Sequence, residues 1–146
     1  MAEHRSIGKK ISFISRSMGR YIDAKTRHLE LGNFTIPFLT YLFENNGVHQ
    51  DVLAEALLFD KSSAARAVAL LEKRGYVTKT PDPENGRKNI IRTTPKAGAV
   101  RAELHGILKK TTRELFAGFS KTEIETYFDL SFRIHENAVN MVKEIK

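Results

Sequence analysis

The sequence predicts a mainly α-helical protein that carries one small β-hairpin. Helix signals, meaning apolar residues near the 3.6-residue period together with capping residues, recur along most of the chain. Only residues 76–94 contain two runs of β-branched residues around a turn. In addition, residues 52–98 follow the order helix, tight turn, helix, strand, glycine-bearing loop and strand. This order is typical of a winged helix-turn-helix, and we expect long helices to flank it on both sides.

The composition fits one globular domain of residues 1–146. Hydrophobic residues make up 41% and charged residues 28% of the chain, which are ordinary fractions. No apolar run approaches the roughly 20 residues that cross a bilayer, and the N-terminus lacks the apolar segment of a secretory signal. The absence of cysteine excludes a disulfide framework and fits a cytoplasmic protein.

Two helices are expected in the N-terminal third. The first covers residues 6–31, where apolar residues recur near the helical period until Gly32. Thr35 has the residue type of an N-cap, and Pro37 suits the first turn of a helix. A second, short helix should therefore run from there to the Asn-Asn-Gly sequence at residues 45–47.

Two further helices form the predicted helix-turn-helix. The first of them covers about residues 50–58. Its expected inward-facing residues are Val52, Leu53 and Leu57. Asp60 is the expected N-cap of the second helix, at residues 61–74, and Gly75 ends it.

The hairpin and the C-terminal helices follow. Residues 76–80 and 89–94 are short runs of strand formers, and residues 81–87 between them predict an exposed loop. Thr94 and Pro95 have the residue types of an N-cap and a first helical position, and open a helix to about residue 119. Ser120 and Glu123 form a capping box that opens the last helix, through about residue 144.

The terminal helices carry apolar stripes that are longer than the central region, residues 35–98, can cover. These stripes lie in residues 6–31 and 99–146. Long helices with uncovered apolar faces usually pack on a second copy of the chain. We therefore predict that both segments are dimerisation helices. An intramolecular helical bundle is the alternative.

Positive charge is concentrated on the central region. The chain has 24 Lys and Arg against 17 Asp and Glu, and residues 61–101 contain ten of the bases but only three of the acids. Such localisation indicates a polyanionic partner. The basic residues are divided between a helix and a hairpin, and the aromatic residues lie mostly in helical apolar stripes. Duplex DNA therefore fits better than an anionic membrane or single-stranded RNA.

The helix at residues 61–74 is the predicted DNA-reading helix. Ala64, Val68 and Leu71 should form its buried face. Small and polar residues on its outer face would let it enter a major groove about 12 Å wide. The expected DNA-binding residues of this helix are Lys61, Ser62, Ser63, Ala65 and Arg66. A solvated amphipathic helix is the alternative, because helix-turn-helix patterns are weak when taken alone.

The hairpin strengthens this interpretation. Arg87 follows Asn85 and Gly86 at the loop tip, where a guanidinium could reach an adjacent minor groove. Basic residues on the strands should lie over phosphates; they are Lys79, Lys88 and Arg92. We expect Asp82 to pair with Arg87 across the loop and to support the wing together with Asn85 and Gly86.

These segments resemble one family. The sequence LAEALLFDKSSAARAVALLEKRGYV, followed by DPENGRK and TTPKAG, is similar to the MarR (multiple antibiotic resistance regulator) family. The resemblance implies a homodimeric transcription regulator, a repressor that binds a pseudo-palindromic operator in duplex DNA and is relieved by a small-molecule effector. On this basis Ser62, Ser63 and Arg66 fall on the family's recognition-helix positions. Asp82 and Arg87 fall on its wing positions.

Two features depart from the family pattern. The wing has Asn85 and Gly86 where an acid followed by a base is usual, so it lacks one charge pair. The recognition helix is rich in alanine, which leaves few side chains to read bases. An effector-binding or protein-interaction module with weak or no specific DNA binding is therefore the alternative function.

Catalytic, metal and cofactor sites are not expected. The five histidines are scattered without ligand spacing, and no cysteine completes a zinc site. No glycine-rich phosphate loop or nucleophile elbow is present. His49, just before a helix, is expected to be structural. The ligand site is unknown; conceivable lining residues are Arg20, Tyr21, His28 and Tyr41, although core or surface roles fit each of them better.

Overall fold

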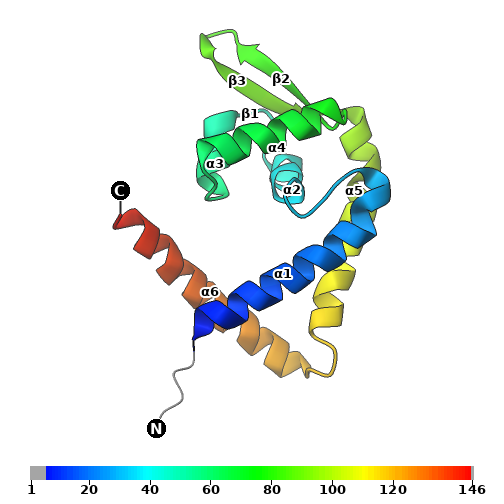
Figure 1. Cartoon of the computed structure of the whole chain (residues 1–146), viewed down its shortest axis with the longest axis vertical. Coiled ribbons are helices and arrows are strands. Elements are labelled where there is room, and N and C mark those ends of the chain that lie inside the picture. Colours follow the sequence, from blue (N-terminus) through cyan, green and yellow to red (C-terminus); the bar gives the residue numbers. More distant parts are fainter. Residues whose placement is uncertain (1–5, 146) are drawn as a thin grey trace. The chain divides into compact units, whose positions relative to one another are not determined.

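The computed structural model describes residues 6–145, and Figure 1 shows their helices and strands. The elements are α1 (Ile7–Thr26), the 3₁₀ turn η1 (Arg27–Leu29), α2 (Ile36–Glu44), β1 (Val48–His49), α3 (Gln50–Ala56), α4 (Lys61–Lys73), β2 (Val77–Asp82), β3 (Asn85–Thr93), α5 (Pro95–Leu115) and α6 (Lys121–Lys143). The predicted fold class, mainly helical with one small β-hairpin, is confirmed.

The three strands form one antiparallel sheet in the order β1-β3-β2. Ile91 lies in the central strand, where it pairs with Val48 on one side and with Lys79 on the other. Strands β2 and β3 make the hairpin, which we call the wing and which extends past α3 and α4 in Figure 1. Its base is therefore held by β1 as well as by the helices.

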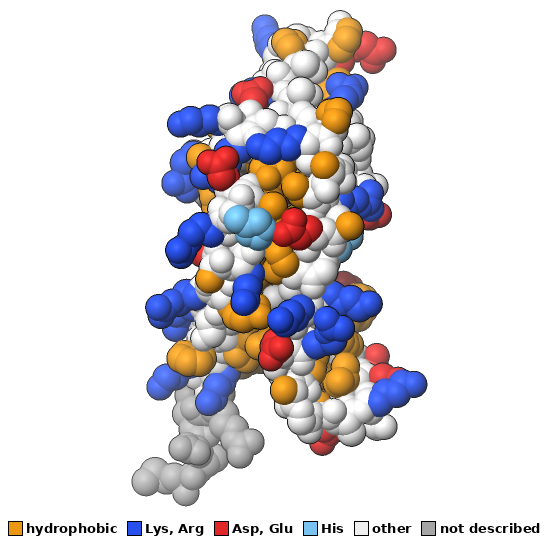
Figure 2. All heavy atoms as spheres, turned by 90° about the vertical axis from the view of Figure 1, so that its right-hand side faces the viewer, with side chains coloured by type: hydrophobic (Ala, Val, Ile, Leu, Met, Phe, Trp, Pro, Cys, Tyr) orange, Lys and Arg blue, Asp and Glu red, His pale blue; other side chains and the backbone are white. Residues whose placement is uncertain are grey.

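The chain divides into two compact units, and the core of the first unit, which ends at Thr111, is built on α2, α3 and α4. Its fully buried leucines and phenylalanine are Phe38, Leu39, Leu42, Leu53, Leu71 and Leu104. Tyr76 joins the core between α4 and β2, and its hydroxyl donates a hydrogen bond to the Leu29 carbonyl at 2.7 Å. Burial raises the pKa of Tyr76. Hydrophobic side chains also reach the surface, as Figure 2 shows between projecting Lys and Arg side chains.

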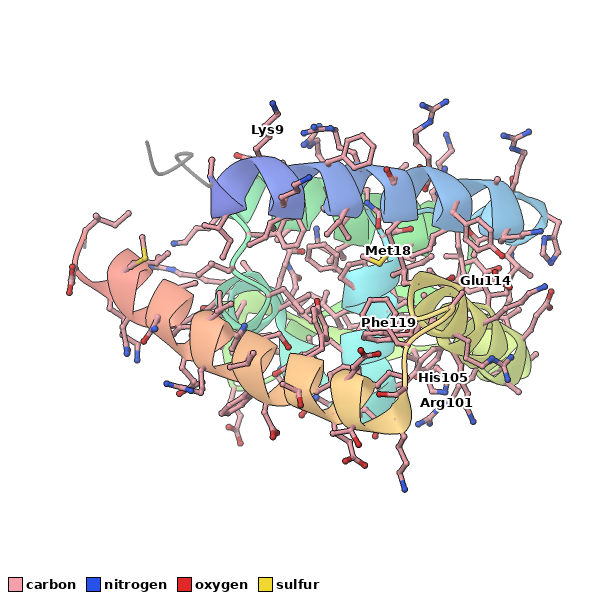
Figure 3. All side chains as sticks on the ribbon, turned by 90° about the horizontal axis from the view of Figure 1, so that it is seen from below. Lys9, Met18, Arg101, His105, Glu114 and Phe119 are labelled. Carbon is pink, nitrogen blue, oxygen red and sulfur yellow. The ribbon has the colours of Figure 1, made fainter. Side chains whose placement is uncertain are left out.

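Helix α1 is buried only in its C-terminal half. Gly19, Ile22 and Thr26 are buried, and the Thr26 hydroxyl donates to the carbonyls of Ile22 and Leu31 at 2.8 Å each. In the N-terminal half, Ile7, Ile11, Phe13 and Ile14 are exposed. Figure 3 shows Lys9 pointing away from the ribbons and Met18 pointing inward from the same helix.

The second unit begins at Thr112 and contains α6. The predicted capping box is confirmed, because Ser120 Oγ accepts from the Glu123 amide and the Glu123 carboxylate accepts from the Ser120 amide. None of the residues of α6 is buried. Close to its N-terminal half, Phe116 packs edge to face against Phe119 and Tyr127 and at a tilt against Phe128. That the whole chain is a single domain stays a prediction.

Several predicted boundaries of helices are wrong. The first helix ends at Thr26 rather than near residue 31, because the chain continues as the 3₁₀ turn η1, which the left-handed Glu30 (φ 55°) then ends. Thr35 precedes α2 but does not cap it, since its hydroxyl bonds to the Gly32 backbone instead. The fifth helix ends at Leu115, four residues early, and Gly118 then takes a positive φ of 87°.

The helix-turn-helix also differs in detail from the prediction. Helix α3 ends at Ala56, and Val52 is 41% exposed, because Leu53 and Ala54 supply the buried face. The two-residue strand β1 was not predicted. In the turn between α3 and α4, Leu58 is 62% exposed and has a φ of 57°. This left-handed backbone costs a branched residue about 1–2 kcal/mol.

We predict that Leu58→Gly raises the free energy of unfolding by up to about 1 kcal/mol. Glycine adopts the left-handed backbone without strain, and little burial is lost at an exposed position. Denaturant unfolding measures the change. As a control, Ala69→Gly, in the exposed face of α4, should lower the free energy of unfolding by about 0.5–1 kcal/mol. Equal destabilisation by both variants would contradict the assignment of strain to Leu58.

Candidate nucleic-acid interface

Helix α4 begins with a side-chain N-cap, as predicted. Asp60 Oδ1 accepts from the Ser63 amide at 2.8 Å, and its Oδ2 accepts from the Ser63 hydroxyl at 2.7 Å. These two bonds, the hydroxyl first, lower the pKa of Asp60. Ser63 is therefore held in the cap, and its hydroxyl proton is not available to a base edge while this bond stands.

One face of α4 is buried and the other is open. Ala64, Ala67, Val68 and Leu71 are at most 1% exposed. Around the N-terminal half, Lys61, Ser62 and Arg66 are exposed, whereas Ser63 and Ala65 are half-buried. The predicted division of this helix into two faces is confirmed. Its exposed face therefore presents the Lys61 ammonium, the Ser62 hydroxyl and the Arg66 guanidinium beside small alanine side chains.

The Arg66 side chain is not loose in solvent. Its guanidinium carbon lies 5.4 Å from the centroid of the Phe34 ring, and its Nη2 donates to Ser63 Oγ at 3.5 Å. Asp60, Ser63 and Arg66 thus form a chain of contacts along the first turns of α4. Phe34 reaches this chain from the connection between η1 and α2. Sequence reasoning placed Arg66 correctly on the outer face but gave no signal for Phe34.

The wing is longer and its turn tighter than predicted. Only Pro83 and Glu84 lie between the strands, so most of the expected loop at residues 81–87 belongs to strands. Pro81 pairs with Asn89, but Asp82 pairs with Asn85, which leaves three extra residues on β3. These residues, Gly86, Arg87 and Lys88, are all exposed. The wing tip, residues 83–88, therefore bulges on the strand that carries Arg87.

The predicted pair between Asp82 and Arg87 is wrong. Asp82 Oδ2 lies 2.7 Å from His49 Nε2, and Oδ1 accepts from the Glu84 amide at 2.9 Å. His49 holds the N-cap position of α3, but its side chain does not cap that helix. Asp82 thus links the wing to the start of α3 rather than holding Arg87. The bond spans 33 residues, and no local pattern could have indicated it.

Asn85 and Gly86 act only locally. Asn85 Oδ1 accepts from the Arg87 amide at 3.3 Å, which shapes the bulge. A Cβ atom added at Gly86 would meet no atom within 4 Å, so a side chain fits there. Lack of space therefore does not explain why this wing has Asn85 and Gly86 where the family usually has a charge pair.

The other basic residues predicted for the wing lie on different faces of the hairpin, and one of them pairs with an acidic residue. Lys79 pairs across the ladder with Ile91 and Arg92 pairs with Thr78, so Lys79 and Arg92 lie on opposite faces of the hairpin. That these residues lie over phosphates stays a prediction. Lys88 lies 3.3 Å from Asp51 at the start of α3, in an exposed pair that contributes little stability.

The helix-turn-helix and wing match one family of known proteins. The sequence profile of the MarR family matches residues 36–88. The uncharacterized HTH-type transcriptional regulator YybA of Bacillus subtilis (strain 168) is 30% identical over 129 residues, which cover 88% of this chain and 86% of that protein. This chain belongs to the MarR family of transcriptional regulators.

Solved structures agree with this assignment. A MarR transcriptional regulator from Methanosarcina mazei Go1 superposes with a TM-score of 0.90 at 26% identity, covering 97% of this chain and 94% of that one. A MarR family regulator from Listeria monocytogenes, solved in complex with a 26mer DNA, shares the fold with a TM-score of 0.84 at 24% identity, covering 93% of this chain and 91% of that one.

Two of the residues considered for a ligand site in this MarR-family chain, His28 and Tyr21, make other contacts. His28 Nε2 lies 2.5 Å from Glu103 Oε1, and both side chains are at least half exposed. Lys25 stacks over the Tyr21 ring. Within residues 6–145, no group of three or more His, Asp or Glu side chains could hold a metal ion, and no helix is long and apolar enough to cross a membrane. His4 lies outside the described residues.

We predict that the link between Asp82 and the helix-turn-helix is lost in acid. The Glu84 amide, and then His49, hold the pKa of Asp82 below its ordinary value of 3.8. A lowered pKa in the folded state means that the stabilisation is present above the ordinary value and disappears as the pH falls through the lowered one. The Glu84 amide resonance should report this titration in NMR spectra.

Two variants distinguish the contact of Asp82 with the Glu84 amide from its contact with His49. Asp82→Asn should abolish the acid titration of the Glu84 amide. His49→Gln should move its midpoint upward, because the His49 contact that stabilises the carboxylate is weakened. A midpoint that is unchanged in His49→Gln would show that His49 does not hold Asp82 in solution.

Proposed function

We propose that this chain is a homodimeric repressor that binds a pseudo-palindromic duplex DNA site and is relieved by a small-molecule effector. The observation that carries the proposal is the presence of two exposed basic elements on one compact unit. These are the outer face of α4, with Lys61 and Arg66, and the wing tip with Arg87. The Listeria regulator, which shares the fold, was solved in complex with a 26mer DNA, and this supports DNA as the partner.

The proposed contacts divide between the two grooves. The alanines of α4 keep the helix narrow, so that Ser62, Ala65 and Arg66 can approach base edges in the major groove. Lys61, at the first helical position, suits a phosphate, which the helix N-terminus also favours. Arg87 would enter the adjacent minor groove, with Lys88 and Lys79 as phosphate contacts from the wing.

The exposed apolar side chains support the homodimer. On α1, Ile7, Ile11 and Ile14 are about half exposed although they form one stripe. On α6, the exposed large hydrophobic residues are Tyr127, Phe128, Leu130, Phe132, Ile134 and Met141. Burial of each large side chain contributes about 1.5–3 kcal/mol, so a second copy gains much by covering them. Two linked α4 helices also gain affinity through effective concentration.

The second candidate is a module of the same fold that binds an effector or a protein but reads no DNA sequence. The departure of the wing from the family pattern favours this module. Asn85 and Gly86 supply no charge at the bulge, and Asp82 does not hold Arg87. Selection of oligonucleotides from a random duplex pool distinguishes the two candidates. A regulator enriches a two-fold symmetric site, whereas the module enriches none.

We predict that Arg87→Ala lowers the affinity for the selected duplex and reduces the slope of log affinity against log salt by about one. The reason is the loss of one charge beside the phosphates. Fluorescence anisotropy over a salt series measures both quantities. Lys109→Ala, which removes an exposed charge from α5, is the control and should change neither. If Arg87→Ala matches the unchanged protein in affinity and slope, the wing does not bind DNA.

We predict that Ile11→Asp and Phe132→Asp each separate the dimer into monomers. Both positions are more than half exposed in one chain, so a single copy tolerates the charge and only the interface between copies loses apolar contact. Deletion of residues 121–146 should also abolish dimerisation and operator binding. Sedimentation at micromolar concentration measures the state, with Phe132→Leu as the control that stays dimeric. A folded monomer of the unchanged protein would contradict the proposal.

A further inference from the structure

The environment of Arg66 carries an inference about how this chain would read its site. Arg66 is the only arginine in α4. Its neighbours on the outer face are alanines or short serines, and Ser63 is engaged by Asp60 through both its amide and its hydroxyl. Base recognition by this helix therefore depends heavily on the direction in which one long side chain points.

Phe34 is placed to control that direction. The connection between η1 and α2 passes beside α4 (Figure 1), and there the Phe34 ring faces the Arg66 guanidinium at 5.4 Å. The ring is itself fixed on its other sides. It packs edge to face against Phe38 at 6.3 Å and against Phe59 at 6.2 Å, and Phe38 is completely buried. A half-buried ring anchored in the core is thus presented to an exposed arginine.

We propose that Phe34 is a positioning residue that orients Arg66 for a guanine in the major groove, which rests on the DNA-binding function proposed above. A guanidinium that stacks on an aromatic ring keeps its N–H donors free in its own plane. Those donors match the O6 and N7 acceptors of guanine as a bidentate pair. Ser63 Oγ, which accepts from Nη2, restrains the same side chain from the helix.

The energetic reason is pre-organisation. A free arginine loses rotamer freedom when it binds a base, which weakens binding. An arginine held by Phe34 and Ser63 has lost part of this freedom before DNA arrives. Phe34 should therefore affect discrimination between base pairs at the position that Arg66 reads, while the charge contacts to phosphates stay the same.

The test is a double-mutant cycle on the duplex selected with the unchanged protein. Arg66→Ala first identifies the base pair whose substitution no longer matters. Phe34→Leu, which removes the ring but keeps an apolar side chain, should then lower discrimination at that base pair about two- to five-fold, as expected for loss of an exposed cation–π contact. Phe34→Tyr keeps the ring and should retain discrimination. Affinity for a scrambled duplex and its salt slope should be unchanged in both variants.

In the Arg66→Ala background, Phe34→Leu should have no further effect on discrimination. Thermal unfolding checks that each variant is folded, and Phe34→Met serves as a second ring-free variant. An equal loss with and without Arg66, or no loss in either ring-free variant, overturns the role of Phe34 and leaves DNA binding intact. If the unchanged protein binds all duplexes alike, the proposed function fails as well.

Discussion

Burial of one face of α4 is the constraint on which the rest of the first unit depends. Ala64, Ala67, Val68 and Leu71 lie against a core that α2 and α3 complete, and this fixes the rotation of the helix about its axis. A helix fixed in rotation must present Lys61, Ser62 and Arg66 outward, because these residues lie on the opposite face. Tyr76 then joins the end of this helix to η1 through the Leu29 carbonyl, so the base of the wing is positioned by the same core.

Not all basic residues that lie close together in the sequence contribute to the surface proposed to face DNA. Lys96 donates to the Arg74 carbonyl at 2.6 Å and stacks over Tyr76, so it closes the C-terminal end of α4. Arg101 pairs with Glu44 at 2.5 Å and lies over Phe43. Figure 3 shows Arg101 and His105 on the same side of α5. Lys96 and Arg101 therefore have partners within the fold, and only part of the ten basic residues of this region belongs to the proposed interface.

The sequence was sufficient for features that depend on local periodicity and capping, and insufficient for those that depend on distant pairs. The two faces of α4, its Asp60 cap and the Ser120 capping box follow from neighbours within four residues. Strand β1 is too short to give a periodic pattern of apolar residues, and it forms because it pairs with β3. The His49 and Asp82 contact and the Phe34 and Arg66 contact each join segments more than 30 residues apart. The sequence prediction therefore paired Asp82 with the nearby Arg87 and not with His49.

In the proposed complex, two α4 helices, held by a homodimer, read two half-sites on one side of a duplex. The most direct measurement is the affinity for a series of selected duplexes in which base pairs are inserted between the half-sites. Because rotation about the DNA axis repeats every 10–10.5 base pairs, an insertion of five should place the half-sites on opposite sides of the duplex. This insertion should reduce the affinity to the level of a single half-site. Affinity that does not change with the insertion would show that the two half-sites are not bound together by one dimer.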